Sequence, residues 1–152
     1  MASRTAAPLC LLLLGMCVIT SGGPIEVTHA FCNIGWLLGL PCDQVNLAIV
    51  TQIRAMGTYK LGPVTASLIE ATHTSEGDQM ENVNFTMRSA FMEQGCHVEG
   101  SSSSVFWYSK FDNTNYCNLH NVILGSGLTQ APSFTEFTNA WSCLEYGGFT
   151  CK

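Results

Sequence analysis

Residues 42–56 read CDQVNLAIVTQIRAM, and this stretch decides the fold because its apolar side chains recur at the spacing of one helix face. The residues on that face are Val45, Ile49, Ile53 and Met56. Pro41 suits the start of the helix, Asp43 complements the positive end of the helix dipole, and Gly57 is expected to end the helix in a left-handed cap. The sequence therefore predicts an amphipathic helix that packs one face against another element.

Stretches with the alternation of β-strands follow this helix. Residues 63–74 (PVTASLIEATHT) are rich in Val, Ile and Thr, and residues 75–78 are expected to be a turn. Residues 80–87 have a period of two, which suits a half-buried antiparallel strand. One face carries Val83, Phe85 and Met87, and the other carries Asn82, Asn84 and Thr86. Asn84-Phe85-Thr86 is also an N-glycosylation sequon, so a glycan is expected on the solvated face.

A third strand-like stretch is interrupted. It begins at Cys96 after a turn at residues 94–95 and continues over residues 105–111 (VFWYSKF), with the serines 101–104 expected to form a bulge or loop between the two halves. Residues 116–124 (YCNLHNVIL) are either a fourth extended segment or a helix.

The C-terminal part predicts a second helix over residues 133–146. Ser133 and Glu136 have the spacing of a capping box. Apolar residues at steps of three and four are expected to lie in the core, namely Phe134, Phe137, Trp141 and Leu144. Residues 23–40 are expected to be an irregular arm. The predicted fold is α+β, a single domain in which a three- to four-stranded antiparallel sheet packs against helices at about 42–56 and 133–146.

A helix followed by antiparallel strands, with a disulfide across the later strands, resembles the element order of cystatin-like domains. The resemblance implies a helix packed across a curved sheet. The Gln-x-Val-x-Gly loop of inhibitory cystatins does not occur in this sequence, and the predicted helix from Ser133 is foreign to that family. The resemblance therefore does not imply protease inhibition.

The first 22 residues have the layout of a secretory signal peptide. Arg4 supplies a positive charge, residues 8–20 (PLCLLLLGMCVIT) are apolar, and small residues offer a cleavage site after Gly22. We therefore expect residues 23–152 to be a mature secreted domain. No membrane anchor is expected, because the later apolar run at residues 34–40 is too short to cross a bilayer.

Six cysteines remain in the mature domain, because Cys10 and Cys17 leave with the signal peptide. An even number of cysteines in a secreted domain predicts a disulfide framework rather than catalytic thiols. The framework comprises Cys32, Cys42, Cys96, Cys117, Cys143 and Cys151. Pairing neighbours along the chain gives 32–42, 96–117 and 143–151, one of the connectivities that six cysteines allow.

The mature chain is acidic. After the loss of Arg4, five basic residues stand against eleven acidic ones, a net charge of about −6. The basic residues are scattered over positions 54, 60, 88, 110 and 152. Proteins that bind phosphate backbones need clustered Lys and Arg, so nucleic acids and anionic membranes are not expected partners.

Three residues form a candidate catalytic set. His97, Lys110 and His120 supply an acid, a base and a cation, and the Lys-x-x-Asn-Thr spacing from Lys110 resembles that of pancreatic ribonucleases. The chain is acidic, however, Ser109 stands where that family has Cys, and the family's N-terminal histidine helix is missing. Cys and His residues do not have the spacing of a zinc site. We therefore predict no catalytic residue, metal or cofactor.

The segment between the two middle cysteines is the candidate binding surface. It gathers five aromatic residues around a polar turn, namely Phe106, Trp107, Tyr108, Phe111 and Tyr116. The sequence thus favours a secreted, non-enzymatic binding protein whose partner is an extracellular protein or a small apolar ligand. The alternatives are a small extracellular hydrolase that uses His97 and His120, and an acidic structural component of the extracellular matrix.

Overall fold

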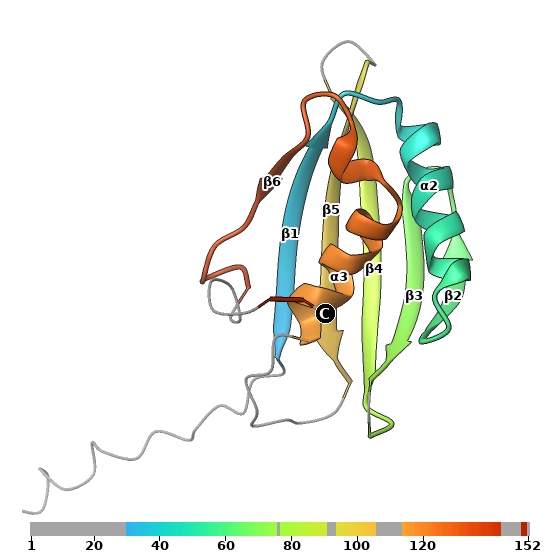
Figure 1. The fold of residues 1–152 in the computed structure, drawn as a ribbon, viewed down its shortest axis with the longest axis vertical. Coiled ribbons are helices and arrows are strands. Elements are labelled where there is room, and N and C mark those ends of the chain that lie inside the picture. The colour runs from blue at the N-terminus through green and yellow to red at the C-terminus, as the bar shows by residue number, and fades with distance from the viewer. Residues whose placement is uncertain (1–29, 76, 91–93, 106–113, 144–149, 152) are drawn as a thin grey trace, which may run out of the picture.

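The computed structural model describes residues 30–75, 77–90, 94–105, 114–143 and 150–151. The fold is α+β, as predicted, and within these residues an antiparallel sheet carries two α-helices on one face (Figure 1). The strands are β1 (Phe31–Leu38), β2 (Tyr59–Val64), β3 (Leu68–Thr74), β4 (Met80–Ala90), β5 (Gly95–Ser104) and β6 (Thr135–Phe137). Their order across the sheet is β2-β3-β4-β5-β1-β6, so the prediction of three or four strands was too low.

The predicted first helix is confirmed as α2 (Cys42–Ala55). Its apolar face is buried at Val45, Ile49 and Ile53, which lie against the sheet. The predicted left-handed cap at Gly57 is wrong, because the chain leaves the helix at Met56 in an extended conformation. The Met56 N–H still reaches the carbonyl groups of Gln52 and Ile53. A helix packed across a sheet is the arrangement that the resemblance to cystatin-like domains implied.

The predicted irregular arm is wrong over its described part, because residues 31–38 form β1 between β5 and β6. Cys32, Ile34, Trp36 and Leu38 are buried in alternation, which is the period of a strand with one face in the core. Residues 23–29 lie outside the described part of the chain.

Two further strand assignments are corrected. The predicted strand 63–74 is two strands, because the chain turns at residues 65–67 and the Thr65 hydroxyl accepts the N–H groups of Ser67 and Leu68. The serine run 101–104 is neither a bulge nor a loop but the regularly paired end of β5, where Ser102 is buried. The strand predicted over residues 105–111 falls outside the described residues after Val105.

The predicted alternation of residues 80–87 is confirmed in β4. Val83, Phe85 and Met87 are buried beneath the helices, whereas the side chains of Asn82, Asn84 and Thr86 point to the opposite side. We call that opposite side the open face of the sheet. Asn84 therefore lies on a solvated strand face, where the sequence placed it.

The second helix is α3 (Thr114–Gly125), not residues 133–146. Of the two alternatives for residues 116–124, the helical one is therefore correct. Residues 133–143 instead contain β6 and a turn, and residues 144–146 lie outside the described part. The predicted aromatic core is also wrong, because Phe137 is 53% exposed and Trp141 is 91% exposed. Only Phe134 packs against the core, and Leu144 is outside the described residues.

All six predicted cysteines form disulfides, but each predicted pair is wrong. The bonds are Cys32–Cys143, Cys42–Cys96 and Cys117–Cys151. They connect β1 with the C-terminal segment, α2 with β5, and α3 with the end of the chain. Over the described residues, the helices are too short or too polar for any of them to cross a membrane.

Candidate functional site: the C-terminal edge of the sheet

The edge segment, which we define as residues 135–143, closes the sheet beside β1. Its strand β6 pairs with β1 in antiparallel register, with Phe137 opposite Gly35 and Thr135 opposite Leu37. Its far end is fixed to the same strand by the Cys32–Cys143 disulfide. The segment is therefore attached to β1 at both ends, by backbone hydrogen bonds and by a covalent bond.

Between these two attachments the chain makes a tight turn at residues 138–142. The Asn139 Oδ1 accepts the N–H groups of Trp141 (2.8 Å) and Ser142 (3.0 Å), and the Asn139 carbonyl accepts the Cys143 N–H (2.9 Å). The Asn33 N–H donates to the Ser142 carbonyl (2.7 Å), which ties the turn to β1. This turn holds Trp141 with 91% of its surface exposed.

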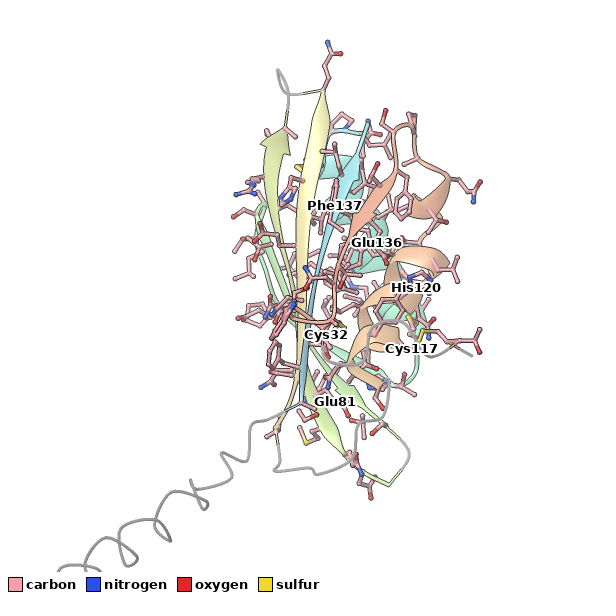
Figure 2. All side chains as sticks on the ribbon, turned by 90° about the vertical axis from the view of Figure 1, so that its left-hand side faces the viewer. Cys32, Glu81, Cys117, His120, Glu136 and Phe137 are labelled. Atoms are coloured by element: carbon pink, nitrogen blue, oxygen red, sulfur yellow. A yellow bond between two sulfur atoms is a disulfide. The ribbon has the colours of Figure 1, made fainter. Side chains whose placement is uncertain are left out.

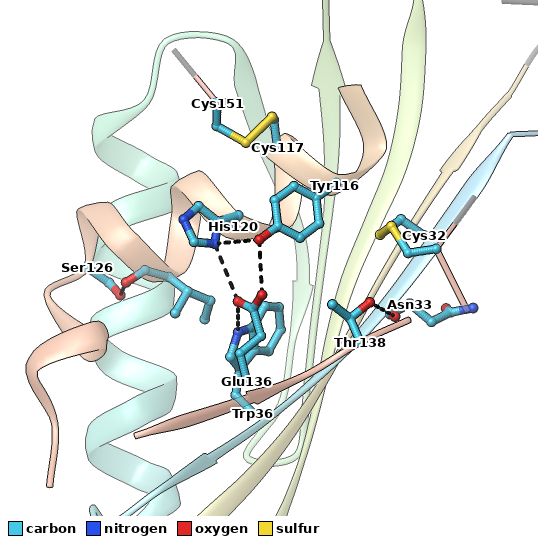
Figure 3. Close-up of polar contacts among 12 residues, drawn as sticks. Cys32, Asn33, Trp36, Tyr116, Cys117, His120, Ser126, Glu136, Thr138 and Cys151 are labelled. Atoms are coloured by element: carbon cyan, nitrogen blue, oxygen red, sulfur yellow. Dashed lines mark hydrogen bonds and ion pairs between the residues drawn. A yellow bond between two sulfur atoms is a disulfide. The ribbon is translucent and has the colours of Figure 1, made fainter. Parts of the chain in front are cut away.

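The inner side of the edge segment is bound to the core through Glu136 (Figure 3). Its Oε2 accepts the Nε1–H of the fully buried Trp36 (2.8 Å), and its Oε1 accepts the Tyr116 hydroxyl (3.0 Å). His120 Nδ1 lies 3.4 Å from Glu136 Oε2, and the Tyr116 and His120 rings stack with their centroids 5.3 Å apart. The carboxylate thus links β1, β6 and α3, and each of its oxygens serves a hydrogen bond that stabilises this junction.

The outer side of the edge segment borders a hollow of about 390 Å³ in the open face. Apart from Phe137, its lining side chains are mostly polar, including Asn33, Asn84, Glu99 and Ser142. His97 also lines it and accepts a hydrogen bond from Arg88 Nε (3.1 Å), while Arg88 Nη2 pairs with Glu99 (3.2 Å). The hollow therefore combines an exposed aromatic ring with polar and charged side chains.

The two histidines of the candidate hydrolase do not share a cleft. His97 lies on the open face, whereas His120 belongs to α3 on the helix side, as Figure 2 shows for His120. Lys110 lies outside the described residues. The two described members of the predicted trio are therefore separated by the sheet itself.

A second polar cluster, which the sequence did not reveal, lies between the sheet and the helices. Glu81 is buried, with His73 Nδ1 at 2.9 Å from its Oε2 and the Ser75 hydroxyl at 3.3 Å from its Oε1. Tyr59 packs on the His73 ring and donates its hydroxyl to the Asn118 carbonyl (2.7 Å). Burial, and then the charge of Glu81, raise the pKa of Tyr59 above its ordinary value.

Serine and asparagine side chains continue this polar interior under α3. The Ser102 hydroxyl donates to Asn115 Oδ1 (2.8 Å) and accepts from Asn118 Nδ2 (3.4 Å). These mutual hydrogen bonds explain why a serine-rich strand and an asparagine-rich helix pack together. Their role is to position α3 on the sheet.

Most of the predicted binding surface falls outside the described residues, namely Phe106, Trp107, Tyr108 and Phe111. Tyr116 is described, and it is half-buried on α3 with its hydroxyl on Glu136, so it packs rather than projects. Among the described aromatic residues, Trp141 is the most exposed at 91%, and Phe137 is 53% exposed. The sequence signal for the exposure of Trp141 was Asn139, a turn-forming residue before Ser142 and Cys143. The helical spacing of the aromatic residues obscured this signal.

In the described part of the chain, no cluster of three or more His, Cys, Asp or Glu side chains could bind a metal ion. No known protein family matches the chain, and no curated protein shows significant similarity to it. The structure thus defines a class, a disulfide-rich α+β protein with an anchored C-terminal edge.

Proposed function

We propose that this chain is a secreted, non-enzymatic binding protein that holds an extracellular protein partner through Trp141. The observation that carries the proposal is a 91% exposed tryptophan on a turn fixed by Asn139, by β1 and by the Cys32–Cys143 disulfide. Tryptophan is enriched among the residues that dominate binding energy, and a preformed turn reduces the entropy lost on association. The signal peptide predicted over residues 1–22 and the three disulfides support export.

A protein partner is favoured over a small apolar ligand by the shape and chemistry of the described surface. Trp141 projects outward, with 91% of its surface exposed. The hollows in the described surface are open rather than enclosed, and charged and amide side chains stand in their walls, as at Asp43, Asn46 and Arg88 near the start of α2. A small apolar ligand needs an apolar enclosure, whereas a protein partner can supply a pocket for a projecting indole.

The test is a binding comparison between three forms of the secreted protein. The wild type, Trp141→Ala and Leu47→Ala are each immobilised and exposed to extracellular fluid from the tissue that secretes the chain, and captured proteins are identified by mass spectrometry. Leu47 is the matched control, because it is another exposed apolar residue but lies on α2.

We expect a partner that is captured by the wild type and by Leu47→Ala but not by Trp141→Ala. With that partner purified, Trp141→Ala should raise the Kd by about 30-fold or more, as for residues at the centre of an interface. Equal capture by wild type and Trp141→Ala, with unchanged circular dichroism, would refute Trp141 as the contact. Retention of the chain inside cells would refute export.

A further inference from the structure

Asn84 stands near the middle of the open face, and Thr86 of its sequon lies on the same strand and the same side. It lies on β4, half-exposed, while Thr86 is exposed on the same side and Phe85 between them is buried in the core. The residues opposite Asn84 on its two neighbouring strands are Glu70 and Ser101. Both sequon side chains that matter, Asn84 and Thr86, therefore point away from the helices.

Two hollows of the open face meet at Asn84. The first, about 390 Å³, extends across β5 and β1 to Phe137 on β6, and the second, about 530 Å³, extends to Gly62 and Pro63 on β2. Both volumes are in the range of sites that hold small ligands. An oligosaccharide attached to Asn84 therefore has room to lie along the sheet in either direction.

The first hollow is chemically better matched to a sugar. Phe137 forms its wall, and a phenyl ring with 53% of its surface exposed can receive the apolar C–H face of a sugar ring. Gly35 lies between Phe137 and His97, and a Cβ there would be 3.8 Å from both residues, so the glycine keeps the space between them open. The second hollow is lined in its described part by small, polar and aliphatic residues without an aromatic ring.

Polar groups complete the first hollow. Four of its residues can form hydrogen bonds with the hydroxyl and acetamide groups of a sugar, namely Asn33, His97, Glu99 and Ser101. Ser101 stands opposite both Asn84 and Asn33, so these three polar side chains form one row across the sheet. An aromatic wall with a polar floor is an arrangement that holds a saccharide in a defined orientation.

We infer that Asn84 carries an N-linked oligosaccharide whose first sugars lie in this hollow and pack on Phe137. In the transfer, Asn84 Nδ2 attacks C1 of a lipid-pyrophosphate-linked oligosaccharide. The N–C1 bond forms, the bond from C1 to the pyrophosphate oxygen breaks, the amide loses one proton, and the lipid pyrophosphate leaves. This inference rests on the proposed export, because the secretory pathway supplies that donor.

The glycan has a consequence for recognition. It covers Phe137 and the polar hollow up to Ser142, but it leaves Trp141 uncovered, because Trp141 does not line that hollow. The open face thereby becomes a shielded face, and the partner approaches at the edge.

Modification is tested with two substitutions at one position. The chain is secreted from eukaryotic cells as wild type, Thr86→Ser and Thr86→Ala, and its intact mass is measured before and after treatment with peptide-N-glycosidase. Thr86→Ser keeps the sequon and should keep the glycan, whereas Thr86→Ala should lose it. Enzymatic release should leave an aspartate in place of Asn84. A secreted wild type without the glycan would overturn this inference alone, and a chain that is not secreted would overturn the proposed export as well.

Packing on Phe137 is tested by comparing the Tm of glycosylated and enzymatically deglycosylated protein. Deglycosylation should lower the Tm of the wild type by a few degrees. The loss should disappear in Phe137→Ala and persist in Leu124→Ala, a control residue on α3 with a similar exposed fraction, 52%. Nuclear Overhauser contacts between Phe137 and the first two sugars should accompany the shift. If deglycosylation lowered the Tm of Phe137→Ala as much as that of the wild type, and the wild type showed no such contacts, the packing of the glycan on Phe137 would be overturned.

Discussion

At the scale of single residues, Glu136 is the side chain whose loss should damage the edge segment most. Trp36 is fully buried, and Glu136 Oε2 accepts its indole N–H at 2.8 Å. Glu136→Ala leaves this donor without its acceptor, so the free energy of unfolding should fall by about 1–3 kcal/mol. Urea denaturation followed by far-UV circular dichroism measures the change.

Glu99→Ala is the matched control for Glu136. Glu99 is also a hydrogen-bonded carboxylate, with Arg88 as its donor, but its side chain is 59% exposed. Water replaces such a contact readily, so this substitution should cost less than about 1 kcal/mol. If the two alanine variants lost similar amounts of unfolding free energy, burial would not be the reason that the Glu136 hydrogen bonds stabilise the protein.

Tyr59 should make stability depend on alkaline pH. Its pKa in the folded protein is raised, first by burial and then by the charge of Glu81, whereas in the unfolded chain it has its ordinary value near 10. The unfolded state therefore loses the phenolic proton first, and the stabilisation present below pH 10 is lost as the pH rises above it. The expected slope is about 1.4 kcal/mol per pH unit above pH 10.

Denaturant titrations between pH 9 and pH 11 measure this slope. Tyr59→Phe removes the ionising group, so it should be less stable than wild type at pH 9 because the bond to the Asn118 carbonyl is lost. Its stability should nevertheless fall less steeply above pH 10. Parallel curves for the two proteins would contradict the assignment to Tyr59.

At the scale of elements, Asn139 should control the order of the turn that presents Trp141. Asn139→Ala removes the acceptor of two backbone N–H groups, a change that costs about 1 kcal/mol at comparable capping positions. The amide hydrogens of Trp141 and Ser142 should then exchange several-fold faster. Asn139→Asp keeps an acceptor oxygen in place and should leave the exchange rates near those of the wild type.

Elements whose local pattern agrees with their tertiary setting could be predicted from the sequence. In α2 the apolar face is continuous, and in β4 the apolar and polar residues alternate strictly, so periodicity alone identifies both. The same alternation was present in β1 at Cys32, Ile34 and Trp36, but Gly35 and Leu37 in the outward positions made it resemble an irregular apolar run.

The edge segment could not be predicted, because tertiary contacts override its local preference. Ser133 has a φ of 57°, which is unsuitable for a helix N-cap, and Glu136 bonds to Trp36 and Tyr116 instead of returning to the Ser133 N–H. Both partners are far away in sequence. The exposure of Trp141 could not be predicted for the same reason, because it depends on which strand the edge segment pairs with.

At the scale of the whole molecule, the disulfides connect parts of the chain that the sequence gives no reason to pair. Cys32–Cys143 spans a sequence separation of 111, Cys42–Cys96 one of 54 and Cys117–Cys151 one of 34. The prediction paired cysteines that are neighbours in the sequence. Cys32 and Cys42 do not meet, however, because β1 and the turn after it lie between them. The sheet order determines which cysteines meet, and that order depends on long-range pairing.

These separations predict a ranking of the disulfides by their contribution to stability. A cross-link stabilises mainly by restricting the unfolded chain, so Cys32–Cys143 should contribute about 4.8 kcal/mol and Cys117–Cys151 about 3.8 kcal/mol in the chain-entropy treatment. Paired alanine variants at each bridge, unfolded in guanidinium chloride without reductant, measure the two losses. The Cys32/Cys143 variant should lose more unfolding free energy than the Cys117/Cys151 variant. It should also lose the turn at residues 138–142, since Cys143 anchors the end of the edge segment. If the Cys117/Cys151 variant were the less stable one, contacts in the folded state rather than loop length would determine the contribution of each bridge.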